Sequence, residues 1–302
     1  MRERAHHRSR ARDDLHSEEQ EGLGLGGLLR SLIRGIPFCE SAASEEAFHI
    51  PRPGASAITI HNANGRTRLF GEDRQDIKLF AAKRARAETV EAAEQMVRDI
   101  HVSVQESDGN LEIDVEIPSK WNRHGSANLE IHLPRDLAVS VTSANGKICM
   151  QDLTGSVHAR SSNGNVSIQD VVGDIEVYAS NAKCCFARTT GRIRARSSNG
   201  KIEFSEHTGS VDASTSNGII NASLTEIGDE GILLATSNGR IVLELPEEVN
   251  AELDIRVENG VIRTARDLCS QMRESNGRIR GTLGRGGSPI KLRTSNGTIS
   301  LR

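Results

Sequence analysis

An Asn-Gly pair recurs every eighteen residues through the middle of this 302-residue chain, and this period constrains the fold more than any other feature. The register holds from Asn145 to Asn217, and only at Asn181 does another residue, Ala182, replace the glycine. After Asn217 the pairs continue at less regular steps as far as Gly297. Such a period is typical of repeat proteins, in which each unit packs mainly on its neighbours. The predicted corner residues are Asn145, Gly146, Asn163, Gly164, Asn199, Gly200, Asn217, Gly218, Asn238, Gly239, Asn276, Gly277, Asn296 and Gly297.

The residues between the glycines alternate between apolar and polar side chains, which indicates short β-strands. After Gly200, for example, Ile202 and Phe204 are apolar and Glu203 between them is charged. A second glycine falls halfway along each regular repeat, so each repeat predicts two strands and two corners. We therefore expect residues 136–302 to form a parallel β-solenoid with coils of about eighteen residues, right-handed like most parallel β crossovers. An antiparallel meander also fits the spacing, but it leaves its apolar face without a covering layer.

The Asn-Gly corners carry two further expectations. Asparagine and glycine adopt positive φ at the lowest cost, so we expect left-handed backbone at each corner and strain at Ala182. Coils in such a stack lie about 4.8 Å apart. The asparagine side chains are therefore expected to bond to one another along the stack, as amides do in other stacked β structures.

Residues 45–135 lack the period and predict an N-terminal cap that covers the open edge of the first coil. The stretch 47–71 reads as strand, turn and strand, and 101–118 reads as a hairpin that turns at Gly109. Between them a helix is expected near 87–100, because its apolar residues recur at helical spacing. The expected buried face of this helix consists of Val90, Ala93, Val97 and Ile100.

Residues 1–44 are expected to form a disordered tail that contains a short amphipathic segment at 22–38. This segment is too short and too charged to span a bilayer, so we expect it to dock on a membrane surface or a protein partner. Docking on the chain's own body and disorder are the alternatives. No signal peptide or transmembrane helix is recognised, which predicts a cytoplasmic protein or one peripheral to a membrane. The apolar face of the segment consists of Leu25, Leu28, Leu29, Leu32, Ile33 and Ile36.

Charge and chain ends suggest few other partners. A net charge of −3 gives no reason to expect nucleic acid. The chain ends in TSNGTISLR without a recognisable capping element, so self-association at the C-terminal edge is expected. Four arginines crowd one coil and predict an anion-binding patch, with a solvated ladder of ion pairs as the alternative reading. These arginines are Arg188, Arg192, Arg194 and Arg196.

The order of motifs along the chain is distinctive. ITIHNANGRTRLFG is followed by an Ala/Glu-rich helix, a hairpin, LEIHLPRDLAVSVTSANGKI and repeated Ser-Asn-Gly. This order, over about residues 50–302, resembles the bacterial β-strand-repeat family usually called "putative adhesins", a domain of unknown function. The resemblance implies a β-solenoid with no established enzymatic activity, in a family whose members are often membrane-tethered or secreted.

The remaining side chains give little support for catalysis. The five cysteines are scattered without metal-ligand spacing, and no Ser/His/Asp or Cys/His arrangement recurs, so no cofactor or metal is expected. The favoured interpretation is a non-catalytic interaction or scaffold protein. A carbohydrate-active β-helix enzyme is one alternative, but it requires paired carboxylates beside a sugar-stacking groove. A calcium-binding β-roll is the other, but it requires aspartates at the glycine corners.

Overall fold

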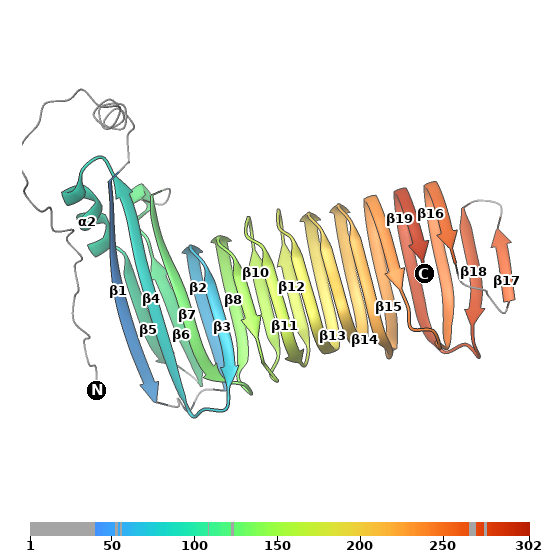
Figure 1. The fold of residues 1–302 in the computed structure, drawn as a ribbon, viewed down its shortest axis with the longest axis horizontal. Helices are drawn as coiled ribbons and strands as arrows, with labels where there is room; N and C mark the ends of the chain where they lie inside the picture. The colour runs from blue at the N-terminus through green and yellow to red at the C-terminus, as the bar shows by residue number, and fades with distance from the viewer. Residues whose placement is uncertain are drawn as a thin grey trace, which may run out of the picture.

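The computed structural model describes residues 40–51, 54, 56–107, 109–121, 124–265, 270–274 and 277–302. The amphipathic segment at 22–38 and the corner residue Asn276 lie outside these ranges. The described part is mainly β, with nineteen strands joined into one long sheet, so the predicted mainly-β class is confirmed (Figure 1).

The first elements in chain order are β1 (Glu40–Pro51), β2 (Ala57–Asn64), β3 (Thr67–Glu72), β4 (Asp76–Ala87), α2 (Val90–Arg98), β5 (His101–Ser107), β6 (Asn110–Glu116), the 3-10 helix η1 (Ser119–Trp121) and β7 (Gly125–Pro134). They are followed by β8 (Ala138–Asn145), β9 (Ile148–Gln151), β10 (Val157–Ser161), β11 (Val166–Val172), β12 (Ile175–Ala179), β13 (Cys184–Asn199), β14 (Ile202–Asn217) and β15 (Ile220–Glu244). The last are β16 (Ala251–Thr264), β17 (Ser270–Glu274), β18 (Arg278–Leu283) and β19 (Ser288–Leu301).

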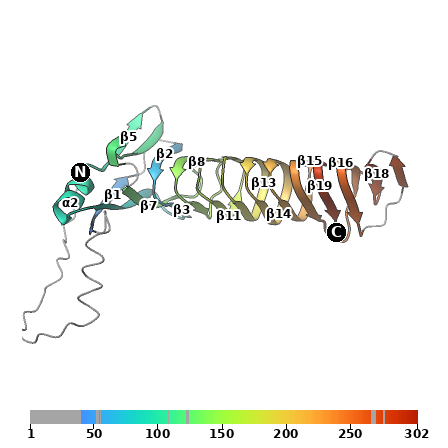
Figure 2. The same cartoon turned by 90° about the horizontal axis from the view of Figure 1, so that it is seen from above.

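The regular repeats pair in parallel with an offset of eighteen residues, as the period predicts. Val157 of β10 lies opposite Ile175 of β12, and Val166 of β11 lies opposite Cys184 of β13. Each repeat thus contributes to two rows of strands. We call the row that contains β2, β8, β10 and β12 the first row, and the row that contains β3, β9 and β11 the second row. Figure 2 shows the two rows as facing layers.

The apolar columns meet between the two rows. Along each regular strand every second side chain is buried, and the buried residues of both rows belong to one core cluster. Phe186 and Phe204, one repeat apart, stack with their ring centroids 4.9 Å apart and their planes 9° from parallel. Stacked rings of this kind stabilise the fold by more than the apolar area that they bury. Contacts within the core therefore also help to keep neighbouring repeats in register.

Asparagine side chains form a continuous ladder along one edge of the stack. Eight hydrogen bonds of 2.8–3.1 Å join nine amides, each Nδ2 donating to the Oδ1 of the next asparagine. The order in space is Asn64, Asn145, Asn163, Asn181, Asn199, Asn217, Asn238, Asn296 and Asn259. The ladder fixes the register of the corners even where the sequence spacing is irregular.

A mid-ladder asparagine should matter more than a terminal one. Asn199 donates to Asn181 and accepts from Asn217, whereas Asn259 donates to Asn296 and has no further ladder neighbour among the described residues. Asn199→Ala is therefore expected to lower the free energy of unfolding by about 1–2 kcal/mol, and Asn259→Ala by about half of that. Urea denaturation followed by circular dichroism measures both, and equal losses would show that the ladder bonds contribute nothing.

The expectation of positive φ at the Asn-Gly corners is wrong for most of them. Of the glycines in these corners, Gly146, Gly164, Gly200, Gly218 and Gly239 have no positive φ. They are required because the backbones stack closely. A Cβ added at any of them would lie 1.7–2.0 Å from the carbonyl oxygen of the residue one coil away, which no side chain can tolerate.

Positive φ instead occurs on the opposite side of the repeat. Gly173, Gly191 and Gly209 have φ between 125° and 145°. Nearby, a column of four non-glycine residues is left-handed with φ of 50–60°, which carries a steric cost for any residue with a Cβ. The four are Asp152, Asp170, Arg188 and Glu206. Ala182 is not among the residues with positive φ, so the strain expected there is absent.

Relieving this strain should stabilise the chain. Glu206 has φ of 55°, so Glu206→Gly is expected to raise the free energy of unfolding by about 0.5–1 kcal/mol. Ala182→Gly is the matched control, because its backbone needs no glycine and the change only adds freedom to the unfolded chain. Thermal unfolding should therefore show a higher midpoint for Glu206→Gly and an unchanged or lower one for Ala182→Gly, and the reverse order would contradict this reading.

The C-terminal strand lies inside the stack and does not end it. β19 pairs in parallel with β15 on one side and with β16 on the other, so the spatial order is β15, β19, β16 (Figure 1). Beyond β16 the first row continues as the antiparallel strands β18 and β17. This corrects the expectation that the segment TSNGTISLR lies at the open C-terminal edge of the stack.

The N-terminal segment contributes both a repeat and a cover. β2 and β3 pair in parallel with β8 and β9, and Asn64 lies opposite Asn145, so the stack begins at Ala57. β5 and β6 form an antiparallel hairpin with Gly109 at φ of 73°. Helix α2 begins after its N-cap Thr89 and buries Ala93, Met96 and Val97 against β1 and β4. Of the expected helix face, Val90 is 44% exposed, because it lies in the first turn and points away from these strands.

Candidate functional site

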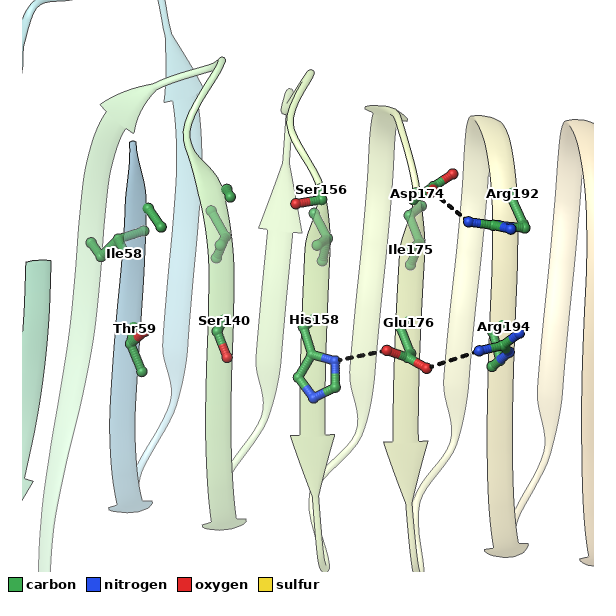
Figure 3. Close-up of a pocket in the computed structure, with 14 residues that line it drawn as sticks. Ile58, Thr59, Ser140, Ser156, His158, Asp174, Ile175, Glu176, Arg192 and Arg194 are labelled. Atoms are coloured by element: carbon green, nitrogen blue, oxygen red, sulfur yellow. Dashed lines mark hydrogen bonds and ion pairs between the residues drawn. The ribbon is translucent and has the colours of Figure 1, made fainter. Parts of the chain in front are cut away.

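A shallow depression of about 330 Å³ lies on the outer face of the first row, close to the N-terminal end of the stack. It crosses five neighbouring strand segments, because one outward position in each segment falls in the same register column. Figure 3 shows the side chains of this column side by side. The side chains of this column are, in spatial order, Thr59, Ser140, His158, Glu176 and Arg194. We call the depression that they line the groove.

Glu176 is the centre of the polar contacts in the groove. Its carboxylate accepts a hydrogen bond of 2.6 Å from the Tyr178 hydroxyl and lies 3.3 Å from Nδ1 of His158 and 3.5 Å from Nη1 of Arg194. The Tyr178 hydrogen bond and then His158 hold the pKa of Glu176 below its usual value, and the same bond raises the pKa of Tyr178. Glu176 is therefore ionised at neutral pH and already shared among three donors, which suits a binding contact better than proton transfer.

The two ends of the groove differ in chemistry. At one end Arg192 donates to Asp174 at 2.8 Å beside Arg194, so this end carries paired charges. At the other end Thr59, Ser140 and Ser156 offer hydroxyl groups on a small-residue surface. A ligand lying across the strands would thus contact neutral hydroxyl groups at one end of the groove and ionised groups at the other.

The four arginines predicted as an anion patch do not all lie on one face of the stack. Arg192, Arg194 and Arg196 lie on the outer face of the first row, whereas Arg188 occupies one of the left-handed corner positions and pairs with Asp170 through two bonds of 2.7 Å. Every one of the four lies within 4 Å of a carboxylate. Exposed pairs of this kind neutralise the charge of the arginines and leave a mixed-charge surface. The carboxylates are Asp170, Asp174, Glu176, Asp212 and Glu230.

Comparison with known families decides the classification. Residues 56–302 match the family described as Toastrack DUF4097, which covers the whole stack of repeats. The chain belongs to the Toastrack DUF4097 family. The resemblance stated from the sequence motifs is confirmed, and the family is a domain of unknown function. Comparison with curated proteins gives no match.

The solved structures that match this Toastrack domain share little sequence with it. A protein from Bacteroides fragilis NCTC 9343 described as a "putative adhesin" is 13% identical with a TM-score of 0.48, over 86% of this chain and 97% of that one. One from Clostridium sporogenes ATCC 15579, a "putative cell adhesion protein", is 10% identical with a TM-score of 0.26, over 86% and 99%. A "putative lipid binding protein" from Parabacteroides distasonis ATCC 8503 is 11% identical with a TM-score of 0.35, over 87% and 97%.

A cluster of metal-ligand type lies next to the groove of the Toastrack domain. The side chains of His61, Glu112 and Asp114 place one ligand atom each within 4.8 Å of one another, and Nε2 of His61 lies 3.7 Å from Oε1 of Glu112. The sequence hides this cluster because β2 and β6, which become parallel neighbours, are separated by about fifty residues. All three side chains are partly exposed and suit a solvated ion pair as well as a cation.

Two neighbouring cysteines of the Toastrack domain, Cys184 and Cys185, lie in surroundings that make their thiols unreactive. Cys184 faces the core, where burial raises the pKa of its thiol to about 12. Cys185 is half-buried, and burial also raises its pKa above the usual value. Both are protonated at neutral pH and are poor nucleophiles. Among the described residues, no helix has the length and apolar composition needed to cross a membrane.

Proposed function

We propose that this Toastrack protein is a non-catalytic interaction or scaffold protein, in which the repeats form a right-handed parallel β-solenoid closed at one end by the α2-containing cap. The observation that carries the proposal is the unbroken asparagine ladder from Asn64 to Asn259. It ties every repeat to the next, so the outer faces keep a fixed geometry over the whole length of the stack. A surface held rigidly in this way binds a partner without a large ordering cost.

The groove is the part of that surface best suited to a protein partner. It combines small hydroxyl-bearing positions with the ionised centre Glu176, and it lies across strands whose register is fixed on both sides. Its shape is shallow and open, as expected for a docking face, and its charges are paired rather than of one sign. A partner with complementary hydrogen-bonding groups fits this pattern.

The segment 22–38 is proposed to attach the protein to a membrane surface or to a second protein. Its apolar face and flanking arginines suit a membrane surface or a hydrophobic groove on a second protein. Self-association, expected from the sequence at the C-terminal edge, is assigned to the outer strands β16, β17 and β18, because β19 is enclosed between β15 and β16.

Photo-crosslinking tests the groove directly. The full chain is produced in its native cells with p-benzoyl-phenylalanine at Ser140 in the groove or at Ser167, the matched control on β11 in the second row. We expect a discrete adduct from Ser140 that disappears when Glu176→Arg is added, and none from Ser167. Adducts from both positions, or from neither, would exclude the groove as the docking site.

Deleting 22–38 should release the protein from its membrane or partner fraction, and unchanged fractionation would exclude that attachment.

A further inference from the structure

A second depression, of about 390 Å³, lies on the outer face of the first row toward the other end of the stack. The surface is hollow there because one outward column of the sheet has short side chains in the middle and long side chains on either side. In that column Ser214 and Ala235 are short, and they lie between Arg196 on one side and Arg293 and Arg256 on the other. The short side chains form the floor, and the arginines on the C-terminal side form a wall.

Neither arginine of this wall forms an ion pair within the described part of the chain, although Arg293 lies near enough to Asp254 to help lower the pKa of that carboxyl. Arg256 and Arg293 lie directly opposite each other on neighbouring parallel strands, and both are exposed. Their neighbours behave differently: Arg278 holds Asp254 through two bonds of 2.7 and 2.8 Å, and Arg196 holds Asp212. Like charges on directly opposed residues destabilise a sheet unless something lies between them.

Hydroxyl groups complete the lining. Ser216, Ser237 and Ser295 occupy consecutive positions of the outward column next to the asparagine ladder, and all three border the depression. The depression therefore combines two exposed guanidinium groups, which form no ion pair among the described residues, with three serine hydroxyls.

One group opposes this charge. Glu258 lies at the edge of the depression, two residues after Arg256 on the same face of β16, and it makes no ion pair with a described residue. Its carboxylate lowers the positive potential of the wall without neutralising both arginines. Replacing Glu258 with a neutral residue should therefore strengthen the binding of an anion.

We propose that this depression is an oxyanion-binding site for a phosphate or sulfate group, held by Arg256 and Arg293 and by the serine hydroxyls on its border. Planar guanidinium groups pair with such oxygens through two parallel hydrogen bonds, and a doubly charged group relieves the repulsion between the two arginines. The site is independent of the groove, since the two share no lining residue. The group comes either as a free ion or on a sulfated or phosphorylated polymer.

Calorimetric titration of the full chain at constant ionic strength tests the site. The probes are sodium sulfate, dextran sulfate and neutral dextran. Wild type is expected to bind sulfate or dextran sulfate and not neutral dextran, and which of the two binds identifies the source. Arg256→Ala and Arg293→Ala should each weaken binding about tenfold or more, and Glu258→Gln should tighten it a few-fold.

The control is Arg240→Ala, which removes one exposed positive charge at a corner that does not border the depression. Its affinity should stay within about twofold of wild type, because screening weakens distant charges. A loss equal to that of Arg256→Ala would mean general charge attraction and would overturn the proposal, as would no binding of either anionic probe. If Arg256→Ala lowers the thermal midpoint, Glu258→Gln decides: unchanged affinity in that variant overturns the site.

Discussion

Gly164→Ala is expected to lower the free energy of unfolding by about 3 kcal/mol or more. The added Cβ would lie 1.7 Å from the carbonyl oxygen and 2.4 Å from the carbonyl carbon of Gly146, one coil away. Neither atom belongs to a flexible side chain, so the backbones of two coils have to move apart. That movement breaks the ladder bond between Asn163 and Asn145, which lies immediately beside the contact. Chemical denaturation followed by circular dichroism measures the loss.

Gly54→Ala is the control for this substitution. A Cβ there meets no atom nearer than 4.0 Å and its backbone has no positive φ, so the change should cost less than about 0.5 kcal/mol. At the equivalent corner of the next repeat the chain has Ala182, whose methyl group is buried, so the backbone spacing there has to differ from that at Gly164. A cost at Gly164 no greater than that at Gly54 would mean that the coils are compliant, and the close approach would then not explain the glycines.

The second large effect is a loss of stability in mild acid that depends on His207. This side chain is fully buried, Nδ1 donates to the Thr189 carbonyl oxygen at 3.0 Å, and Nε2 has no partner among the described residues. Burial lowers the pKa of His207 to about 4 from 6.5. Between these values the unfolded chain binds a proton that the folded chain does not, so stability is full above about pH 6.5 and falls as the pH approaches 4, by roughly 3 kcal/mol.

Stability measured as a function of pH in wild type, His207→Gln and His101→Gln tests this assignment. His207→Gln should flatten the slope between pH 6.5 and 4.5, whatever it costs at neutral pH, because the titrating group is gone. His101 is exposed at the start of β5, so His101→Gln should keep the wild-type slope. The ion-paired carboxylates, such as Glu203 and Asp254, have lowered pKa values and lose their contribution only at lower pH. An unchanged slope in His207→Gln would assign the acid sensitivity to another group.

The period of the sequence predicted the parallel pairing of the regular repeats because each residue and its neighbour in the sheet are eighteen positions apart. It could not predict the first repeat. Asn64 and Asn145 are adjacent in the ladder but separated by 81 residues, which include β3 to β7 and helix α2. The order of the strands at the far end of the stack could not be predicted from the sequence for a similar reason. Asn238 bonds to Asn296 across 58 residues and not to the next Asn-Gly pair along the chain.

The candidate sites depended on the same long-range register. His158, Glu176 and Arg194 could be aligned from the sequence because they are eighteen residues apart, but Thr59 joins them only through β2. Sequence proximity did not reveal that Arg188 lies apart from the other three arginines, nor which carboxylates pair with them from the neighbouring repeats. Arg256 and Arg293 were not singled out, since they become neighbours only when β19 enters between β15 and β16.

That insertion sets an order on biosynthesis. β16 leaves the ribosome before β19, yet the place between β15 and β16 belongs to β19. β16 can pair with β18 as soon as that strand emerges, but it is not joined to β15 until Ser288–Leu301 has been synthesised. The regular repeats can assemble as they emerge, because each finds its neighbour eighteen residues behind it. The C-terminal quarter closes last and across long chain separations. A chain in which β19 has not yet been synthesised therefore exposes unpaired edges on β15 and β16, which favours aggregation and proteolysis.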